Sequence, residues 1–294
     1  MKLQKNISLK NHTSFQIGGK AKYFCVVKNK EDLVSAIKFA KEKKLPFFIL
    51  GQGSNLLVAD KGFKGVVIKI ENCKVKIENC KAFAEAGVLL SRLVNSSAES
   101  GLTGLEWAAG IPGTVGGAVY GNAGAFGKSM KDITKTVTVL EITNSKLRTL
   151  NKFKIKKYKN KECHFGYGDS IFKKKKNLII VSADLKLKKG KKKEIKRRIK
   201  EYSDYKKATQ PLNFPSAGSI FKNYKKFFAG ELIEKCNLKG KKIGKAKISE
   251  KHANFIVNLG GAQAKDVKKL IKLIKKEVKN KFKVVLEEEI DFLS

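Results

Sequence analysis

The sequence predicts an α+β protein of two domains, and three observations favour this fold class. The chain has 294 residues, more than one compact core usually holds. Strand-like and helix-like segments alternate at its start, and strands predominate after them. A polar helix that stops at Pro211 then separates a tail with elements of its own. We expect subdomains at 1–70 and 71–200 and a further domain at 201–294, whose last strand can pack back on the first subdomain.

The first subdomain begins with a strand, a helix and two further strands. Leu33, Ile37 and Ala40 recur at helical spacing, and Pro46 stops that helix. The expected helix spans 31–44, and the expected strands are at 22–28, 47–50 and 66–70.

Strands predominate in the second subdomain, and the tail closes with a helix and a strand. Residues 75–87 alternate polar and apolar side chains, and a helix follows that Gly101 ends. Val267, Leu270, Ile271 and Ile274 lie on one face of a helix near the end of the chain. The expected strands are at 136–142, 178–187 and 283–293, and the expected helices are at 88–101, 191–212 and 264–278.

The formal net charge of +38 has two explanations. Excess lysine could neutralise the phosphates of a nucleic acid. Only four of the 64 basic residues are arginine, however, and sequence-reading proteins rely on arginine for two-pronged contacts. The lysine runs, such as 173–176, also lack interleaved aromatic residues. We therefore expect lysine drift and no nucleic-acid partner, while the positive field would attract anions such as nucleotide diphosphates.

Cysteine and histidine are too scattered for a metal site. The five cysteines form no CxxC pair, and the three histidines lie far apart in the sequence. The first residues contain no apolar run typical of a signal peptide, and nowhere do enough apolar residues follow one another to span a membrane. We expect no metal, no membrane insertion and a cytoplasmic location, and the sequence carries no prediction of oligomeric state.

Two glycine-rich segments suggest that the backbone binds a phosphate-bearing ligand. The first, 51–55, follows a strand, and its N–H groups could line one concavity, although an ordinary tight turn explains it equally well. The second, 108–118, is glycine-dense and uncharged in a chain that is 31% charged, which suits close approach to a flat flavin ring and its pyrophosphate. Neither is a G-x-G-x-x-G turn that opens a helix.

Six motifs in order, together covering nearly the whole chain, resemble the UDP-N-acetylenolpyruvoylglucosamine reductases. They are TSFQIGGKA (13–21), GQGSNLL (51–57), GLEWAAGIPGTVGGAVYGNAGAFG (104–127), TQPLNFPSAGSIFKN (209–223), SEKHANFIVNLGGAQAKDV (249–267) and LEEEI (286–290). The short 188–210 connector and PSAGS look like the second, shorter class of this family.

The resemblance implies a vanillyl-alcohol-oxidase/PCMH-type FAD-binding domain of two α/β subdomains, followed by an α+β substrate-binding domain. It implies FAD as cofactor, NADPH as reductant, and reduction of UDP-N-acetylglucosamine enolpyruvate to UDP-N-acetylmuramate for peptidoglycan. We expect the FAD to be non-covalent, because neither glycine-rich segment holds His or Cys. The expected cofactor-binding residues are Gly51, Gln52, Gly53, Ser54, Asn55, Gly110, Ile111, Pro112, Gly113, Thr114, Gly116, Gly117, Asn122, Gly124 and Val181.

The same resemblance implies the catalytic residues. Ser219 matches the family's proton-donating serine, and Glu289 matches its catalytic carboxylate. Glu287 is a second register for that carboxylate, and a solvated acidic strand end is the plain alternative. The expected substrate-binding residues are Tyr167, Gln210, Lys222, Asn223, His252 and Asn254.

One position departs from the family pattern, because Gly168 stands where the family has an arginine. The resemblance implies that this arginine pairs with the substrate carboxylate, and a flexible lysine does not reproduce its planar fork. A decaying gene, replacement by a lysine such as Lys173, or a flavin-binding protein with impaired catalysis would each explain the glycine. We expect residual reductase activity that rises in Gly168→Arg.

Overall fold

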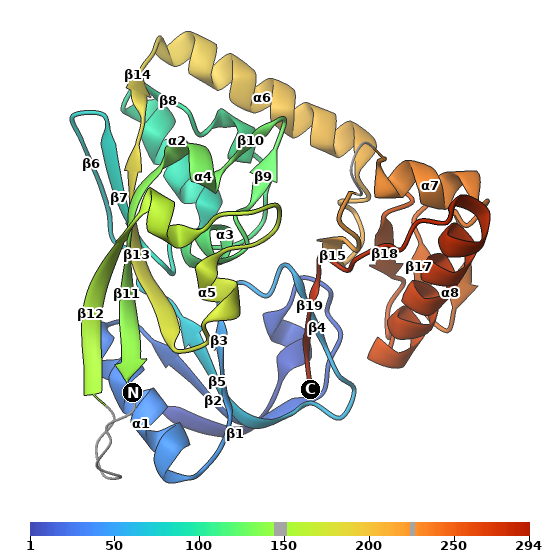
Figure 1. The fold of residues 1–294 in the computed structure, drawn as a ribbon, viewed down its shortest axis with the longest axis horizontal. Coiled ribbons are helices and arrows are strands. Elements are labelled where there is room, and N and C mark those ends of the chain that lie inside the picture. Colours follow the sequence, from blue (N-terminus) through green and yellow to red (C-terminus); the bar gives the residue numbers. More distant parts are fainter. Residues whose placement is uncertain (144–151, 224–226) are drawn as a thin grey trace.

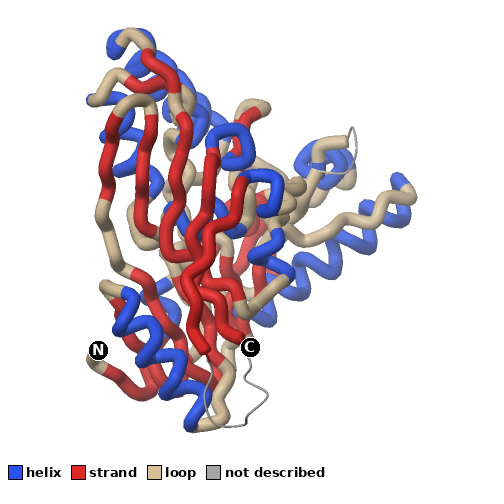
Figure 2. Tube along the Cα trace, turned by 60° about the vertical axis from the view of Figure 1, so that its left-hand side comes forward, coloured by secondary structure: helices blue, strands red, loops and turns tan. Residues whose placement is uncertain are grey.

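The computed structural model describes residues 1–143, 152–223 and 227–294, and within them the strands form three larger sheets (Figure 1). Figure 2 shows the strands of the first sheet below those of the second. Helix α6 (Lys192–Thr209) leads from the second sheet to the C-terminal part, across the top of Figure 1. In the described part of the chain, no helix combines the length and apolar character needed to cross a membrane.

The first sheet has the strand order β1-β2-β5-β3 and packs against α1 (Lys30–Glu42). β2, β5 and β3 are parallel, whereas β1 pairs antiparallel with β2 at the edge. Leu33, Ile37 and Ala40 of α1 are buried, and Asn29 caps the helix by accepting a hydrogen bond from the Asp32 N–H. The strands span Leu3–Ser8 (β1), Lys20–Val27 (β2), Phe47–Leu50 (β3) and Phe63–Ile70 (β5). The helix and the three strands predicted for this region are confirmed, and β1 was not predicted.

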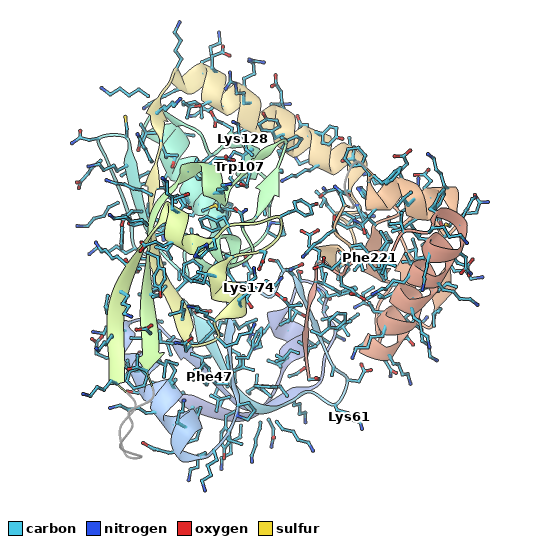
Figure 3. The ribbon with its side chains drawn as sticks, viewed as in Figure 1. Phe47, Lys61, Trp107, Lys128, Lys174 and Phe221 are labelled. Atoms are coloured by element: carbon cyan, nitrogen blue, oxygen red, sulfur yellow. The ribbon has the colours of Figure 1, made fainter. Side chains whose placement is uncertain are left out.

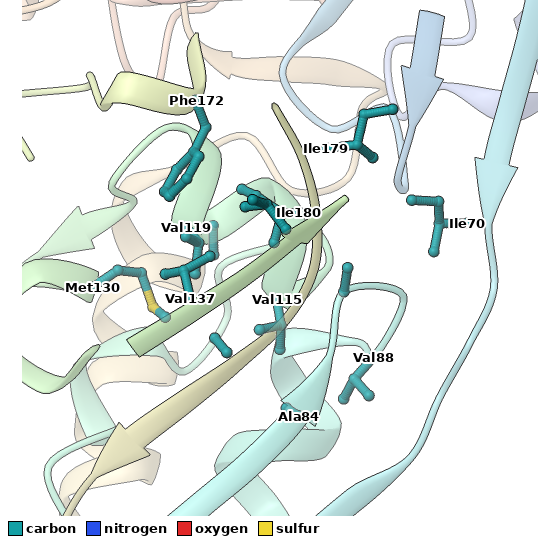
Figure 4. Packing of buried hydrophobic residues seen from close by; sticks show 14 of the residues in the cluster. Ile70, Ala84, Val88, Val115, Val119, Met130, Val137, Phe172, Ile179 and Ile180 are labelled. Carbon is teal, nitrogen blue, oxygen red and sulfur yellow. The ribbon is translucent and has the colours of Figure 1, made fainter. Parts of the chain in front are cut away.

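The second sheet, β12-β11-β13-β7-β6, is antiparallel throughout. One hydrophobic core extends from α1 through both sheets, so the two share their interior. Figure 4 shows part of it, where Val119, Met130 and Phe172 gather near Val137 and Ile180. The strands span Val75–Glu78 (β6), Lys81–Glu85 (β7), Thr134–Thr143 (β11), Lys152–Lys159 (β12) and Leu178–Lys186 (β13). The two strands and the helix predicted here are confirmed, the helix as α2 (Leu90–Glu99).

Short elements complete the first two-thirds of the chain. They are η1 (Leu9–His12), β4 (Leu56–Val58), β8 (Leu102–Thr103), η2 (Glu106–Ala108), α3 (Val115–Tyr120), β9 (Gly124–Ala125), β10 (Lys128–Ser129), α4 (Met130–Ile133), η3 (Asn160–Cys163), α5 (Ile171–Lys174) and β14 (Lys188–Lys189). α3 begins inside the second glycine-rich segment, and its first residues pack on β7 and β13.

The C-terminal sheet, β15-β18-β17-β16, packs against α8 (Ala264–Phe282), which in turn contacts α7 (Ala229–Lys235). The four apolar residues predicted to share one helix face are all buried on α8. Phe15, Ile17 and Leu57 from the start of the chain belong to the same core. Asp60 adds a polar link, because its carboxylate accepts hydrogen bonds from the first N–H groups of α8. The strands span Ser216–Ser219 (β15), Lys242–Ile243 (β16), Ala246–Ile248 (β17) and Phe255–Asn258 (β18).

The long strand predicted at 283–293 is wrong for most of its length. Only β19 (Asp291–Leu293) is a strand, and it pairs in parallel with β4 of the first part of the chain. The preceding residues bond to a different partner, the segment 220–222. The tail therefore passes from one partner to another, and no single ladder can continue along it.

Candidate active site

The two glycine-rich segments lie against each other. The Ser54 hydroxyl donates a hydrogen bond to the Pro112 carbonyl over 3.1 Å. A Cβ atom placed on Gly51 would lie 2.6 Å from Thr114 Oγ1, and one on Gly113 would lie 3.1 Å from Ser54 Oγ. Real Cβ atoms do not approach as closely as 2.6 Å, and a contact of 3.1 Å is tight, so glycine at both positions lets the two loops meet. The structure thus brings together the two segments that the sequence singled out.

The paired loops suit a flavin nucleotide. Gly53 and Gly113 have φ values of +64° and +132°, a backbone conformation that glycine adopts readily and other residues rarely do. Gly110, Pro112 and Gly117 are exposed on the second loop, so a ligand can approach the chain itself. A pyrophosphate needs such uncharged, bulk-free backbone, and a cradle of this kind fits the FAD that the sequence predicted.

Other predicted cofactor residues have structural contacts of their own. A Cβ on Gly116 would come 2.8 Å from the Ala86 Cβ, so this glycine allows α3 to pack on the segment that follows β7. Asn122 is buried; its amide nitrogen donates to the Gly166 carbonyl and its amide oxygen accepts from the Lys131 N–H. Gly124 packs on Ser129, and Val181 accepts a backbone hydrogen bond from Ala86. The packing and hydrogen bonds of these residues therefore hold the protein segments around the loops in place.

Ser219 and Glu289 lie on neighbouring extended segments. The Glu289 N–H donates to the Ile220 carbonyl over 2.8 Å, and the Lys222 N–H donates to the Glu287 carbonyl over 2.9 Å. Ser219 is the residue before Ile220 at the end of β15, so the backbones of the predicted proton donor and carboxylate lie close together. Figure 3 labels Phe221 on this side and Lys174 of α5 on the side that faces it.

The first glycine-rich loop is hydrogen-bonded to the Glu289 segment. The Asn55 amide nitrogen donates to the Glu289 carbonyl over 3.0 Å, and the Asp291 N–H donates to the Asn55 carbonyl over 2.9 Å. Sequence reasoning placed Asn55 in the cofactor loop but missed this link. The two residues are 234 positions apart, so no local pattern could have revealed it.

The charges of two lysines act on the Glu289 carboxylate. Burial raises its pKa above the ordinary range of a glutamate, while the charges of Lys173 and Lys222 act in the opposite direction. Lys222 is ion-paired with Glu287, whose side chain is 72% exposed, and Lys173 is ion-paired with Asp291. Of the two glutamates that the sequence left open, Glu289 therefore has the shielded position that a proton-exchanging carboxylate needs.

Gly168 adopts the left-handed conformation and packs on Lys222. Its φ is +61°, and a Cβ there would lie 3.4 Å from the Lys222 Cε. The neighbouring Tyr167 is 61% exposed, and its hydroxyl accepts a weak 3.4 Å hydrogen bond from the Asn223 N–H. The aliphatic stem of Lys222 thus lies in the space beside residue 168, and three of the predicted substrate residues cluster here.

The remaining predicted substrate residues lie elsewhere or are already engaged. Asn254 is buried, and its amide group bonds to both the N–H and the carbonyl of Phe221, which positions the segment after Ser219. Burial lowers the pKa of His252, whose Nδ1 accepts a hydrogen bond from the Asn254 N–H. Gln210 lines a groove of about 430 Å³ between the end of α6 and the C-terminal sheet, together with Phe214 and Val257.

Residues 210–293 match a protein family described as the C-terminal domain of UDP-N-acetylenolpyruvoylglucosamine reductase, and residues 21–151 match one described as an FAD binding domain. A curated relative named UDP-N-acetylenolpyruvoylglucosamine reductase, from Caldanaerobacter subterraneus subsp. tengcongensis, is 45% identical over 98% of this chain and 93% of its own length. The relative of the same name from Alkaliphilus oremlandii is 44% identical over 96% of this chain and 90% of its own. The chain belongs to the UDP-N-acetylenolpyruvoylglucosamine reductase family.

A solved structure agrees with this membership. The crystal structure of UDP-N-acetylenolpyruvylglucosamine reductase from Thermus caldophilus superposes with a TM-score of 0.83, at 35% identity and over 100% of both chains. The predicted architecture, an FAD-binding domain followed by a reductase C-terminal domain, is confirmed. The predicted cofactor, FAD, agrees with the family that residues 21–151 match.

Proposed function

We propose that this protein reduces UDP-N-acetylglucosamine enolpyruvate to UDP-N-acetylmuramate, with NADPH as reductant, in peptidoglycan precursor synthesis. The near full-length identity to enzymes named for this reduction supports the proposal. One structural observation carries it. The glycine loop that suits FAD, the half-buried Glu289 and the segment that follows Ser219 are joined by consecutive hydrogen bonds.

FAD, when bound, supplies hydride transfer between NADPH and the enol ether. Loop residues 51–55 and 110–114 hold it through backbone groups, and their side chains bring no charge that would compete with a pyrophosphate. We place the FAD-binding region at 1–70 and 71–200 and the substrate-binding domain at 201–294.

Ser219 donates the proton that completes the reduction, and Glu289 assists it. A serine hydroxyl is a weak acid, so it needs help from a neighbour whose proton affinity suits the task. The Glu289 N–H donates to the carbonyl of Ile220, the residue after Ser219, and the burial of Glu289 favours its protonated form. Lys222 and Asn223, on the same segment as Ser219, bind the nucleotide part, with Tyr167 across from them.

The substrate and NADPH are the small molecules that this site would take. We also propose that the protein acts in the cytoplasm and has no nucleic-acid partner. The second candidate function is that of an FAD-binding protein with impaired catalysis, and only the glycine at residue 168 favours it.

The test is NADPH oxidation by the purified, yellow protein with the enolpyruvyl nucleotide as acceptor. Ser219→Ala should bind FAD like the wild type, while its turnover falls about 100- to 10,000-fold, the usual worth of a positioned proton donor. FAD binding without substrate-dependent oxidation in the wild type would support the second candidate. A colourless protein that takes up no FAD would contradict both.

A further inference from the structure

Lys206 of α6 is a buried lysine at the back of the second glycine-rich loop. It is 5% exposed, although it lies in a helix whose other lysines are mostly in solvent. Its ammonium donates a 2.8 Å hydrogen bond to the Ala109 carbonyl, and a Cβ on Gly110 would lie 3.2 Å from its Cδ. The stem and head of one side chain thus both contact the loop.

Aromatic rings complete the surroundings of this lysine. The ammonium lies 5.7 Å from the centre of the Phe126 ring. Phe126 stacks on Tyr202 at 4.2 Å and meets Tyr205 edge-on, and both tyrosines belong to α6. The helix therefore holds two glycine-rich stretches, 108–117 and 124–127, through one cluster.

No carboxylate forms an ion pair with Lys206 within the described ranges. The carboxylate of Glu106, in the adjoining η2, accepts hydrogen bonds from the Thr103 hydroxyl and the Gly104 N–H. Asp204 of α6 pairs with Lys200 and Lys207. The titratable groups on the elements packed against α6 are Glu106 of η2 and Arg92 and Glu99 of α2, and those next to Lys206 on α6 itself are Tyr202, Asp204, Tyr205 and Lys207.

A buried cation without a partner anion costs free energy, and a ligand that supplies the anion removes part of this cost. Burial alone lowers the pKa of Lys206 to about 8, and no charged neighbour opposes the change. The loop that Lys206 contacts is the one proposed to hold the FAD pyrophosphate, which is the missing negative charge.

We infer that Lys206 is a positioning residue for the cofactor: it fixes the loop 108–117 to α6 and gives this loop a positive charge for the bound pyrophosphate. The link continues through the molecule. The loop held at Ala109 receives the Ser54 hydroxyl at Pro112, and Asn55, beside Ser54, bonds to Glu289. The inference rests on the proposed function, because it assumes that the loop binds FAD.

The experiment measures FAD affinity of the wild type, Lys206→Met, Lys206→Arg and Lys207→Met between pH 7 and 9.5. Lys207 is the matched control, since it is the next residue of α6 and its side chain is 68% exposed. The wild type should bind FAD about tenfold more weakly at pH 9.5 than at pH 7, because Lys206 loses its proton in this interval. Lys206→Met should be weak at both pH values, whereas Lys207→Met should follow the wild type.

Lys206→Arg separates charge from contact, because a guanidinium keeps its proton throughout this range. It should bind FAD with an affinity that does not change with pH. Equal FAD affinity in Lys206→Met and the wild type, with no change over this range, would overturn the inference. If Lys206→Met does not fold, a flat pH profile of the wild type alone overturns it. Failure of the wild type to bind FAD at all would instead refute the proposed function.

Discussion

Gly168→Arg tests whether this site lacks a cation that its reaction needs. The backbone cost can be worked from the structure: φ is +61°, and a side chain in this conformation costs about 1–2 kcal/mol. The new Cβ would contact the Lys222 Cε at 3.4 Å, which is an ordinary contact at a flexible side chain and adds little. We therefore expect the variant to fold, and we expect urea unfolding to show a free energy of unfolding that is lower by about 1–2 kcal/mol.

We expect the turnover of the folded variant to rise despite this loss of stability. A single preorganised donor to a developing charge is commonly worth about 100- to 1,000-fold in turnover. Lys222 already lies beside this position, so we expect the lower end, a rise of about 100-fold in kcat for NADPH oxidation at saturating substrate. Gly168→Ala is the matched control, because it carries the same backbone strain without a guanidinium. Equal turnover in the Arg and Ala variants would refute the role assigned to this position.

Two further predictions concern Glu289 and the loop that it contacts. Burial raises the pKa of Glu289, so between the ordinary pKa of a glutamate and this raised value the native state holds a proton that the unfolded state has released. The free energy of unfolding of the wild type should therefore fall relative to that of Glu289→Gln as pH rises through that window. Urea unfolding at several pH values would show this. The same variant should lose about 100- to 10,000-fold in kcat. Asn55→Ala removes the bond to the Glu289 carbonyl and should cost about 1–3 kcal/mol, with lower turnover in the FAD-loaded protein; unchanged stability and turnover would contradict the link.

Local pattern predicted the regular elements of this fold well. Apolar residues at helical spacing and a following proline located α1 to within two residues at its end, because each signal acts over one or two turns. The uncharged glycine loops also stood out by composition alone. Their contact with each other did not, since it depends on a strand and a helix that bring residues 51 and 114 together.

The failures share a physical cause, which is long-range pairing. Phe15 and Ile17 fall within the first predicted subdomain, yet both are buried in the C-terminal core. The segment 283–290 has strand-forming residues but bonds only briefly to residues 220–222 before β19 pairs with β4. Lys206 belongs to a polar helix, yet the loop at Ala109 and the aromatic residues beside it remove it from water. In each case tertiary contacts override the local preference.

The ion pairs of the lysines that act on Glu289 explain why the glycine at residue 168 matters. In a chain with 64 basic residues, a shortage of positive charge at the reaction centre is not expected. Yet both lysines that act on Glu289 are ion-paired, Lys222 with Glu287 and Lys173 with Asp291. A substrate carboxylate arriving here meets cations whose charge is already shared, and it must compete with a protein carboxylate for each of them. An arginine at residue 168 would add one further cation beside Lys222, so the effect of Gly168→Arg measures how far the local positive charge falls short. The excess of lysine elsewhere on the surface cannot substitute for it.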